Sequence, residues 1–232
     1  ALDRNLLRHQ VLPLLRRRWP SASATLARSA RHCAEAAELV DGLAVQTMMQ
    51  LVGTHPGTLL IPLLDELFHP LQKAVLRAWL KWHGFRTPDS RHLERILSEV
   101  LPAGADAQPL VRWAGCEVRR YRQDLFCLSP LSEPPSPGLR VAWTLGPSPA
   151  TLELPHGLGR LEWRPAAEDS TGTTTVSDPS RGVSLTVRFG QLGLACRTSA
   201  RAHRWSMTKR FLEAAVPTWL RPYVPQVFLD DR

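Results

Sequence analysis

The side chains that could do chemistry in this sequence are mainly cationic and aromatic. The segment from Arg181 to Arg221 contains eight basic residues and a single acidic one, Glu213. Cationic side chains release counterions from a nucleic-acid backbone, which favours binding. Four aromatic residues lie among them; such rings can stack on bases, although filling a core is their commoner use. The segment therefore predicts contact with RNA or DNA, and the alternative is a merely solvated charged face.

Two further basic clusters lie outside that segment. If residues 119–122 form a strand, Arg120 and Arg122 share one face while Arg119 and Tyr121 share the other. Residues 16–18 are three arginines at the end of a predicted helix, where cations complement the helix dipole and need no ligand. The candidate RNA-binding residues are therefore Arg119, Arg120, Arg122, Arg188, Arg201, Arg204, Lys209, Arg210 and Arg221.

The charge of the whole chain agrees with a polyanionic partner. The 232 residues include 29 basic and 21 acidic ones, which gives a formal net charge of +8 and a pI of about 10.1. Only three of the basic residues are lysines. Arginine offers a planar fork that matches phosphate, although a GC-rich genome would also favour arginine over lysine. Such a genome does not explain the net charge.

The sequence shows no catalytic motif. It has no glycine-rich dinucleotide loop, no Walker loop, no Gly-x-Ser-x-Gly and no His-Glu-x-x-His. The run from Gly53 to Gly57 resembles a phosphate loop, but Pro56 removes one of the amides that such a loop needs, so we predict a turn. The eight histidines are dispersed. We therefore expect no catalytic residue, and an independent RNA-modifying enzyme is the weakest hypothesis.

The cysteines indicate neither zinc nor disulfides. Cys33, Cys116, Cys127 and Cys196 form no C-x-x-C pair and have no histidine at zinc-finger spacing, so we expect no metal site. Scattered single cysteines are typical of a reduced compartment, and we expect a cytoplasmic protein. No apolar run is long enough to span a membrane, and the first residues do not have the pattern of a secretory signal.

Composition and periodicity predict a globular α+β chain of two domains. Hydrophobic residues make up 44% and charged residues 22%. The first domain, 1–128, is predicted to be mainly helical with a small β-hairpin; its helices cover 3–18, 21–52, 70–83 and about 90–100. The helix at 3–18 is expected to kink before Pro13, and the hairpin within 110–128 to turn at Ala114-Gly115.

The remaining chain is predicted to be a linker and a small β-rich domain. Residues 129–150 are proline-rich and read as a linker with a possible strand at 139–145. The second domain, 151–232, has short strand candidates separated by glycines and one helix. These are strands at 151–154, 160–163, 183–189, 192–196 and 226–229, and the helix at 207–215.

Several segments, in order along nearly the whole chain, resemble the bacterial tRNA(Ile)-lysidine synthetases. The stretch 4–20, which covers most of the predicted N-terminal helix 1–19 and ends at Pro20, resembles the linker helix that follows the catalytic domain in that family. Others are Val75-Leu76-Arg77-Ala78-Trp79-Leu80, Leu110-Val111-Arg112-Trp113, Glu117-Val118-Arg119-Arg120-Tyr121, the stretch 152–159, Val187-Arg188-Phe189 and Val216-Pro217-Thr218-Trp219-Leu220-Arg221.

The resemblance implies a function. Enzymes of this family use ATP, with Mg²⁺, to activate the wobble cytidine of an isoleucine tRNA with a CAU anticodon, and then join lysine to it. That chemistry belongs to an N-terminal catalytic domain with a Ser-Gly-Gly-x-Asp-Ser loop, which this sequence lacks. The resemblance implies that this chain is a tRNA-binding part, inactive alone and without a cofactor of its own. Its partners would be that tRNA and the catalytic domain.

The resemblance also bears on the second domain, which would be similar to a domain of the phenylalanyl-tRNA synthetase β chain. The family usually continues past the last strand with another strand, whereas this chain ends at Arg232. This departure points to a truncated second domain or an altered edge. The alternative function is a basic protein-interaction or oligomerisation module without RNA binding. The apolar stripe that we predict along 26–51 would then dock a partner helix or a second subunit.

Overall fold

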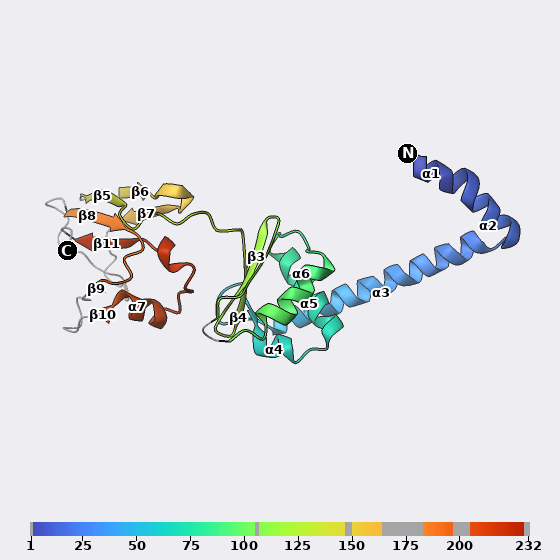
Figure 1. The fold of residues 1–232 in the computed structure, drawn as a ribbon, viewed down its shortest axis with the longest axis horizontal. Coiled ribbons are helices and arrows are strands. Elements are labelled where there is room, and N and C mark those ends of the chain that lie inside the picture. The colour runs from blue at the N-terminus through green and yellow to red at the C-terminus, as the bar shows by residue number, and fades with distance from the viewer. Residues whose placement is uncertain (1, 105–106, 147–149, 164–182, 197–204, 230–232) are drawn as a thin grey trace. The chain divides into compact units, whose positions relative to one another are not determined.

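The structure is a computed structural model that describes residues 2–104, 107–146, 150–163, 183–196 and 205–229. The chain divides into two compact units, 1–130 and 131–232 (Figure 1). Each unit has its own core of buried apolar residues. Among the described residues, no helix is both long enough and apolar enough to cross a membrane.

The first unit begins with helices that are joined end to end. Helix α1 (Leu2–Leu6), a π-helical turn η1 (Leu7–Val11) and α2 (Leu12–Arg18) precede the long helix α3 (Ala22–Gln50). The kink expected before Pro13 takes the form of that π-helical turn, in which the amide of Leu12 donates to the carbonyl of Leu7. Gly42 does not interrupt α3.

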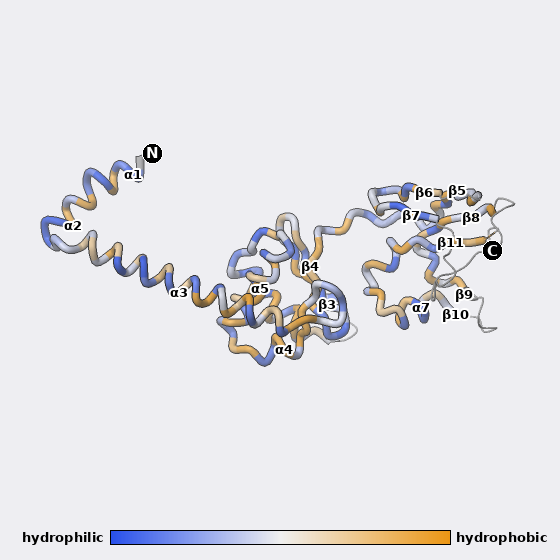
Figure 2. Tube along the Cα trace, turned by 180° about the vertical axis from the view of Figure 1, so that it is seen from behind, coloured by the Kyte–Doolittle hydropathy of each residue, from blue (hydrophilic) through white to orange (hydrophobic). Residues whose placement is uncertain are grey.

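The stripe predicted along α3 is buried only at its C-terminal end. Ala44, Met48 and the following Leu51 are buried in the core of the unit, where α3 packs against α5 (His69–Trp82). Leu26 and Val40 belong to the same stripe but are 57% and 50% exposed. Figure 2 shows that α3 becomes more hydrophobic toward α5. The predicted stripe is therefore present, but among the described residues only its last third contributes to the core.

Besides α5, the helical part of the first unit contains three short elements. They are α4 (Ile61–Asp65), α6 (Ser90–Arg95) and a π-helical turn η2 (Ile96–Val100). Helix α5 buries Leu71, Val75, Leu76 and Trp79, whose spacing of three and four residues places them on one face. Gly84 follows α5 with a φ of 79°, a left-handed conformation that glycine adopts without strain.

A four-stranded antiparallel sheet packs with these helices. Its strands are β1 (Leu59–Leu60), β2 (Leu110–Trp113), β3 (Cys116–Tyr121) and β4 (Asp124–Leu128), in the order β1-β4-β3-β2. The predicted hairpin turns at Ala114-Gly115, and Gly115 has a φ of 82°. Buried residues of β2 and β3, such as Val111 and Val118, join the helical core.

The second unit combines a small sheet with β-hairpins and short helices. Strands β5 (Arg140–Leu145), β8 (Val183–Arg188) and β11 (Gln226–Leu229) form a sheet in the order β11-β8-β5. The other elements are β6 (Ala150–Glu153), η3 (Pro155–Gly157), β7 (Arg160–Trp163), β9 (Ala195–Cys196), β10 (Trp205–Ser206), α7 (Met207–Glu213) and η5 (Arg221–Tyr223).

Part of the predicted linker 129–150 belongs to this second unit. Residues 140–145 form β5, which pairs with β8 in antiparallel register, so that Trp143 lies opposite Leu185. Both side chains are buried in the second core together with Val187 and Phe189. Alternating apolar residues in β5 therefore outweigh the prolines on either side of it, and the second unit begins before residue 151.

Candidate nucleic-acid interface

The nearest approach to a catalytic constellation is a group of polar residues around the buried carboxylate of Asp124. Its oxygens accept from the amides of Thr54 and His55 at 2.9 and 3.1 Å and from the Thr54 hydroxyl at 2.5 Å, and they also contact His55 Nδ1. The Thr54 hydroxyl lies 3.2 Å from the same His55 Nδ1. In a catalytic triad the hydroxyl and the carboxylate bind opposite ring nitrogens. This group therefore ties the 53–57 turn to β4 and does not form a nucleophile.

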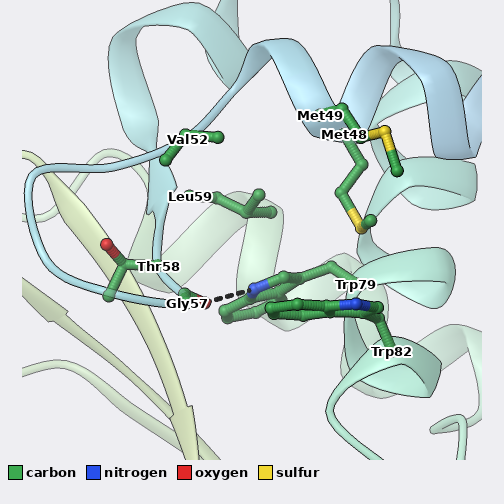
Figure 3. A pocket seen from close by; sticks show the side chains of 8 residues that line it. All are labelled: Met48, Met49, Val52, Gly57, Thr58, Leu59, Trp79 and Trp82. Atoms are coloured by element: carbon green, nitrogen blue, oxygen red, sulfur yellow. Dashed lines mark hydrogen bonds between the residues drawn. The ribbon is translucent and has the colours of Figure 1, made fainter.

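An apolar pocket lies beside this turn (Figure 3). It has a volume of about 160 Å³ and is lined by Met48, Met49, Val52, Gly57, Thr58, Leu59, Trp79 and Trp82. Trp79 Nε1 donates to the carbonyl of Gly57 at 2.9 Å, which fixes one wall. No titratable side chain lines the pocket, so the pocket offers no acid or base for a reaction. Among the described residues, no group of three or more histidine, cysteine or acidic side chains could hold a metal ion.

The predicted cluster on β3 divides into structural arginines and an exposed one. Arg119 is 13% exposed, and its Nε lies 2.8 Å from the carboxylate of the buried Glu117. Arg120 donates to the carbonyls of Arg122 and Leu101. Arg122 is exposed, and its guanidinium carbon lies 5.2 Å from the centre of the Tyr121 ring. Of these three arginines, Arg122 is therefore the most accessible to RNA.

The predicted residues of the second unit occupy different environments. The Arg188 guanidinium lies 4.8 Å over the ring of Phe228. Lys209 is exposed on α7, and its neighbour Arg210 lies 3.6 Å from Glu213. Arg221 is only 8% exposed and donates from Nε to the carbonyl of Val216 at 3.2 Å. Arg201 and Arg204 lie outside the described residues, so their assignment stays a prediction.

Sequence reasoning overlooked two sets of basic residues. Strand pairing places Arg140 of β5 directly opposite Arg188 of β8. The two residues are far apart in the sequence, so their proximity follows only from the register of the two strands. The arginines of α1–α3 were assigned to helix ends or left aside, although all of them are exposed. In the sequence, residues 2–31 hold seven arginines and one acidic residue, whereas the rest of α3 adds Glu35, Glu38 and Asp41.

Alanine substitution should lower the stability of the second unit at Arg221 but not at Lys209. We expect Arg221→Ala to lower the free energy of unfolding by about 1–3 kcal/mol, because it removes a buried side chain and leaves the Val216 carbonyl without this donor. Lys209→Ala removes an exposed side chain and should leave the thermal transition unchanged. Differential scanning calorimetry compares the two variants. Equal transitions would contradict a structural role for Arg221.

Comparison with known proteins places this arrangement in a family. The family model described as TilS substrate binding domain matches residues 59–126, and the one described as TilS substrate C-terminal domain matches residues 185–232. The first match covers most of the four-stranded sheet together with helices α4–α6, and the second covers β8 to the end of the chain.

Full-length relatives extend the match to nearly the whole chain. The tRNA(Ile)-lysidine synthase of Coxiella burnetii is 38% identical over 230 residues, which are 99% of this chain and 49% of the relative. That of Methylococcus capsulatus is 38% identical over 234 residues, 99% of this chain and 51% of the relative. That of Edwardsiella ictaluri is 35% identical over 229 residues, again 99% and 49%.

The chain thus spans about half the length of the curated relatives that it matches. The two matched domains follow one another in this half, one in each compact unit. The chain therefore belongs to the tRNA(Ile)-lysidine synthase family and contains its substrate-binding and C-terminal domains.

Proposed function

We propose that this chain is the tRNA-binding part of a tRNA(Ile)-lysidine synthase. The observation that carries the proposal is the match of residues 59–126 to a substrate-binding domain, within relatives that cover 99% of the chain. The substrate of a tRNA(Ile)-lysidine synthase is by its name a tRNA. The net charge of +8 gives the chain the electrostatic character that such a substrate requires.

In the whole protein, the reaction would ligate lysine to the wobble cytidine of the isoleucine tRNA with a CAU anticodon, with ATP and Mg²⁺ bound in a separate catalytic domain. The residues present here do not fit that chemistry, since the sequence has no Ser-Gly-Gly-x-Asp-Ser loop. The role of this chain is therefore to bind and orient the tRNA. We propose that the second unit does so with a fold similar to a domain of the phenylalanyl-tRNA synthetase β chain.

The proposed place of this chain in the reducing cytoplasm is supported by the free thiols of Cys33, Cys116 and Cys127. Burial, and secondarily the charge of Glu117, raises the pKa of the Cys116 thiol to about 12. Burial likewise raises the pKa of Cys127. Both thiols are therefore protonated at neutral pH and poorly reactive, which suits structural residues and not redox or metal-binding ones.

Binding of tRNA by this chain should depend steeply on salt. We expect the logarithm of the association constant to fall linearly with the logarithm of the salt concentration, by about 0.7–0.9 for each phosphate contact. Replacing Arg122, Lys209 and Arg210 with glutamine should flatten that slope, and replacing Arg201 and Arg204 as well should flatten it further. Fluorescence anisotropy with labelled tRNA measures both quantities. A chain with no affinity for tRNA at low salt would refute the proposed function.

Arg95→Gln provides a control for these variants. Arg95 is partly exposed like Arg210, but its ion pair with Glu99 is bidentate at 2.7 and 2.9 Å, whereas Arg210 lies 3.6 Å from Glu213. Its charge is therefore already compensated locally. The salt slope of this variant should equal that of the unmodified chain.

A second candidate function is protein interaction or self-association. The observation in its favour is the exposure of large apolar side chains around the pocket: Met49 is 67% exposed and Trp82 is 64% exposed. Exposed apolar patches commonly mark interaction sites. Sedimentation velocity would show whether the chain forms a dimer, as expected if this surface is an interface. Self-association that added RNA does not change would favour this function over the first.

A further inference from the structure

The helices that precede the matched substrate-binding domain carry an unusual concentration of positive charge. Residues 2–31 contain seven arginines and one acidic residue, Asp3. All seven arginines are exposed. We call them the α1–α3 arginines; they are Arg4, Arg8, Arg16, Arg17, Arg18, Arg28 and Arg31. They lie outside both segments that match the family models, 59–126 and 185–232.

The charge of these arginines is not compensated within the part of the chain that the structure describes. None of them takes part in the ion pairs found there; Arg16 Nε donates to the Ser23 hydroxyl at 3.0 Å, and Arg18 lies 5.7 Å from the ring centre of Trp19. The core of the same unit is different. There Lys73 contacts Glu94, and Glu117 binds two arginines. Within the described residues, the α1–α3 arginines thus form an exposed cluster of positive charge without the ion pairs that Lys73, Arg112 and Arg119 make.

Helix geometry also separates these arginines from the packing surface. At about 100° per residue, Arg28 lies about 160° around α3 from Ala44, and Arg31 lies about 140° from it. Ala44 faces the core against α5. Arg28 and Arg31 therefore occupy the opposite face of the helix, and neither is needed to attach α3 to the core.

We propose that the α1–α3 arginines bind the sugar–phosphate backbone of the same tRNA at a second place, outside the two recognised domains. This inference rests on the proposed function. Guanidinium groups suit phosphate because their planar fork donates two parallel hydrogen bonds, and residues 2–31 contain arginine but no lysine. Residues 2–18 extend about 25 Å as helix, and residues 22–31 of α3 add about 15 Å after the break at 19–21, enough to reach several phosphates. Such contacts carry no base specificity.

The test compares two charge-matched variants of the full chain. The first replaces Arg4, Arg8, Arg28 and Arg31 with glutamine, a residue that preserves helix propensity. The second replaces four other arginines of the first unit with glutamine. They are exposed or partly exposed: Arg77, Arg86, Arg91 and Arg95. We expect the first variant to bind tRNA at least tenfold more weakly at 0.1 M salt, with a slope flatter by about 3. Because these four lie in the segment that matches the substrate-binding domain, the second variant should also weaken binding, but by a smaller factor than the first.

Further arms of the same experiment make the outcome decisive. Lysine at positions 4, 8, 28 and 31 should restore most of the slope, and a non-cognate duplex RNA should compete through the same residues. Circular dichroism verifies that the helices are retained. Unchanged binding in the first variant, equal losses in both variants, or competition by polyglutamate as strong as that by RNA would each overturn the inference. If the unmodified chain binds no tRNA at all, the proposed function itself fails.

Discussion

Glu117→Gln is expected to lower the free energy of unfolding of the first unit by about 2–4 kcal/mol, because it removes the charge that two arginines share. Glu117 is completely buried on β3. One of its oxygens lies 2.6 Å from Arg112 and the other lies 2.8 Å from Arg119. Glutamine keeps the shape but presents an amide nitrogen to one of the guanidinium groups. The mostly buried Arg119 is then left without its counter-charge.

Urea denaturation followed by circular dichroism measures this effect. Glu99→Gln is the matched control, since it removes the same charge from an exposed pair with Arg95, and exposed pairs contribute little to stability. A triple variant with Glu117→Leu, Arg112→Met and Arg119→Met should recover most of the loss, because apolar side chains can replace a buried ion cluster. If Glu117→Gln and Glu99→Gln unfold at the same denaturant concentration, the buried cluster does not stabilise the unit.

Asp124→Asn is expected to cost a similar amount, about 2–4 kcal/mol, through the loss of the 53–57 turn. The carboxylate accepts from two amides and from the Thr54 hydroxyl, and it contacts the His55 ring. An asparagine side chain has a single acceptor oxygen, so some of these donors would be left unsatisfied. Asp65→Asn, at an exposed position on α4, is the control with the same change of charge. Equal stability of the two variants would contradict the role assigned to Asp124.

The same carboxylate makes the stability of the first unit depend on pH. Burial by itself raises the pKa of Asp124, but hydrogen bonds from His55 and Thr54 outweigh it and hold the pKa below the ordinary value of 3.8. A lowered pKa in the folded state means that the stabilisation is complete above about pH 4 and is lost as pH falls through the folded-state value. Acid unfolding of Asp124→Asn should therefore be less steep than that of the unmodified chain.

The helices and strands were largely predictable because local patterns determine them. The spacing of Leu71, Val75, Leu76 and Trp79 predicts α5, and the structure confirms this face. The stripe along α3 was also recognised, but periodicity identifies an apolar face without showing what covers it. By periodicity Leu26 is equivalent to Met48, although only Met48 is buried in the core. The possible strand at 139–145 is confirmed as β5, but the prolines around it led to its assignment to a linker and not to the second domain.

The candidate site was less predictable because the partners of its arginines are distant or are backbone atoms. Arg119 stands two residues after Glu117 on a strand, so the sequence contained the signal for that ion pair. Arg120 and Arg221 instead donate to the carbonyls of Leu101 and Val216. Every residue has a carbonyl, and no spacing rule marks the one that will accept. Arginine counts therefore predict a polyanionic partner, but not which arginines remain available to it.

The exposed part of α3 has a mechanical consequence. Residues 24–43 are exposed and rich in alanine, so this stretch keeps its helical form through its own backbone and not through packing. A straight helix of this kind works as a ruler: each residue adds about 1.5 Å of length and about 100° of rotation. Deleting a single residue would swing α1 and α2 to another side of the axis. Deleting seven would restore their orientation almost fully while drawing them about 10 Å closer to the core.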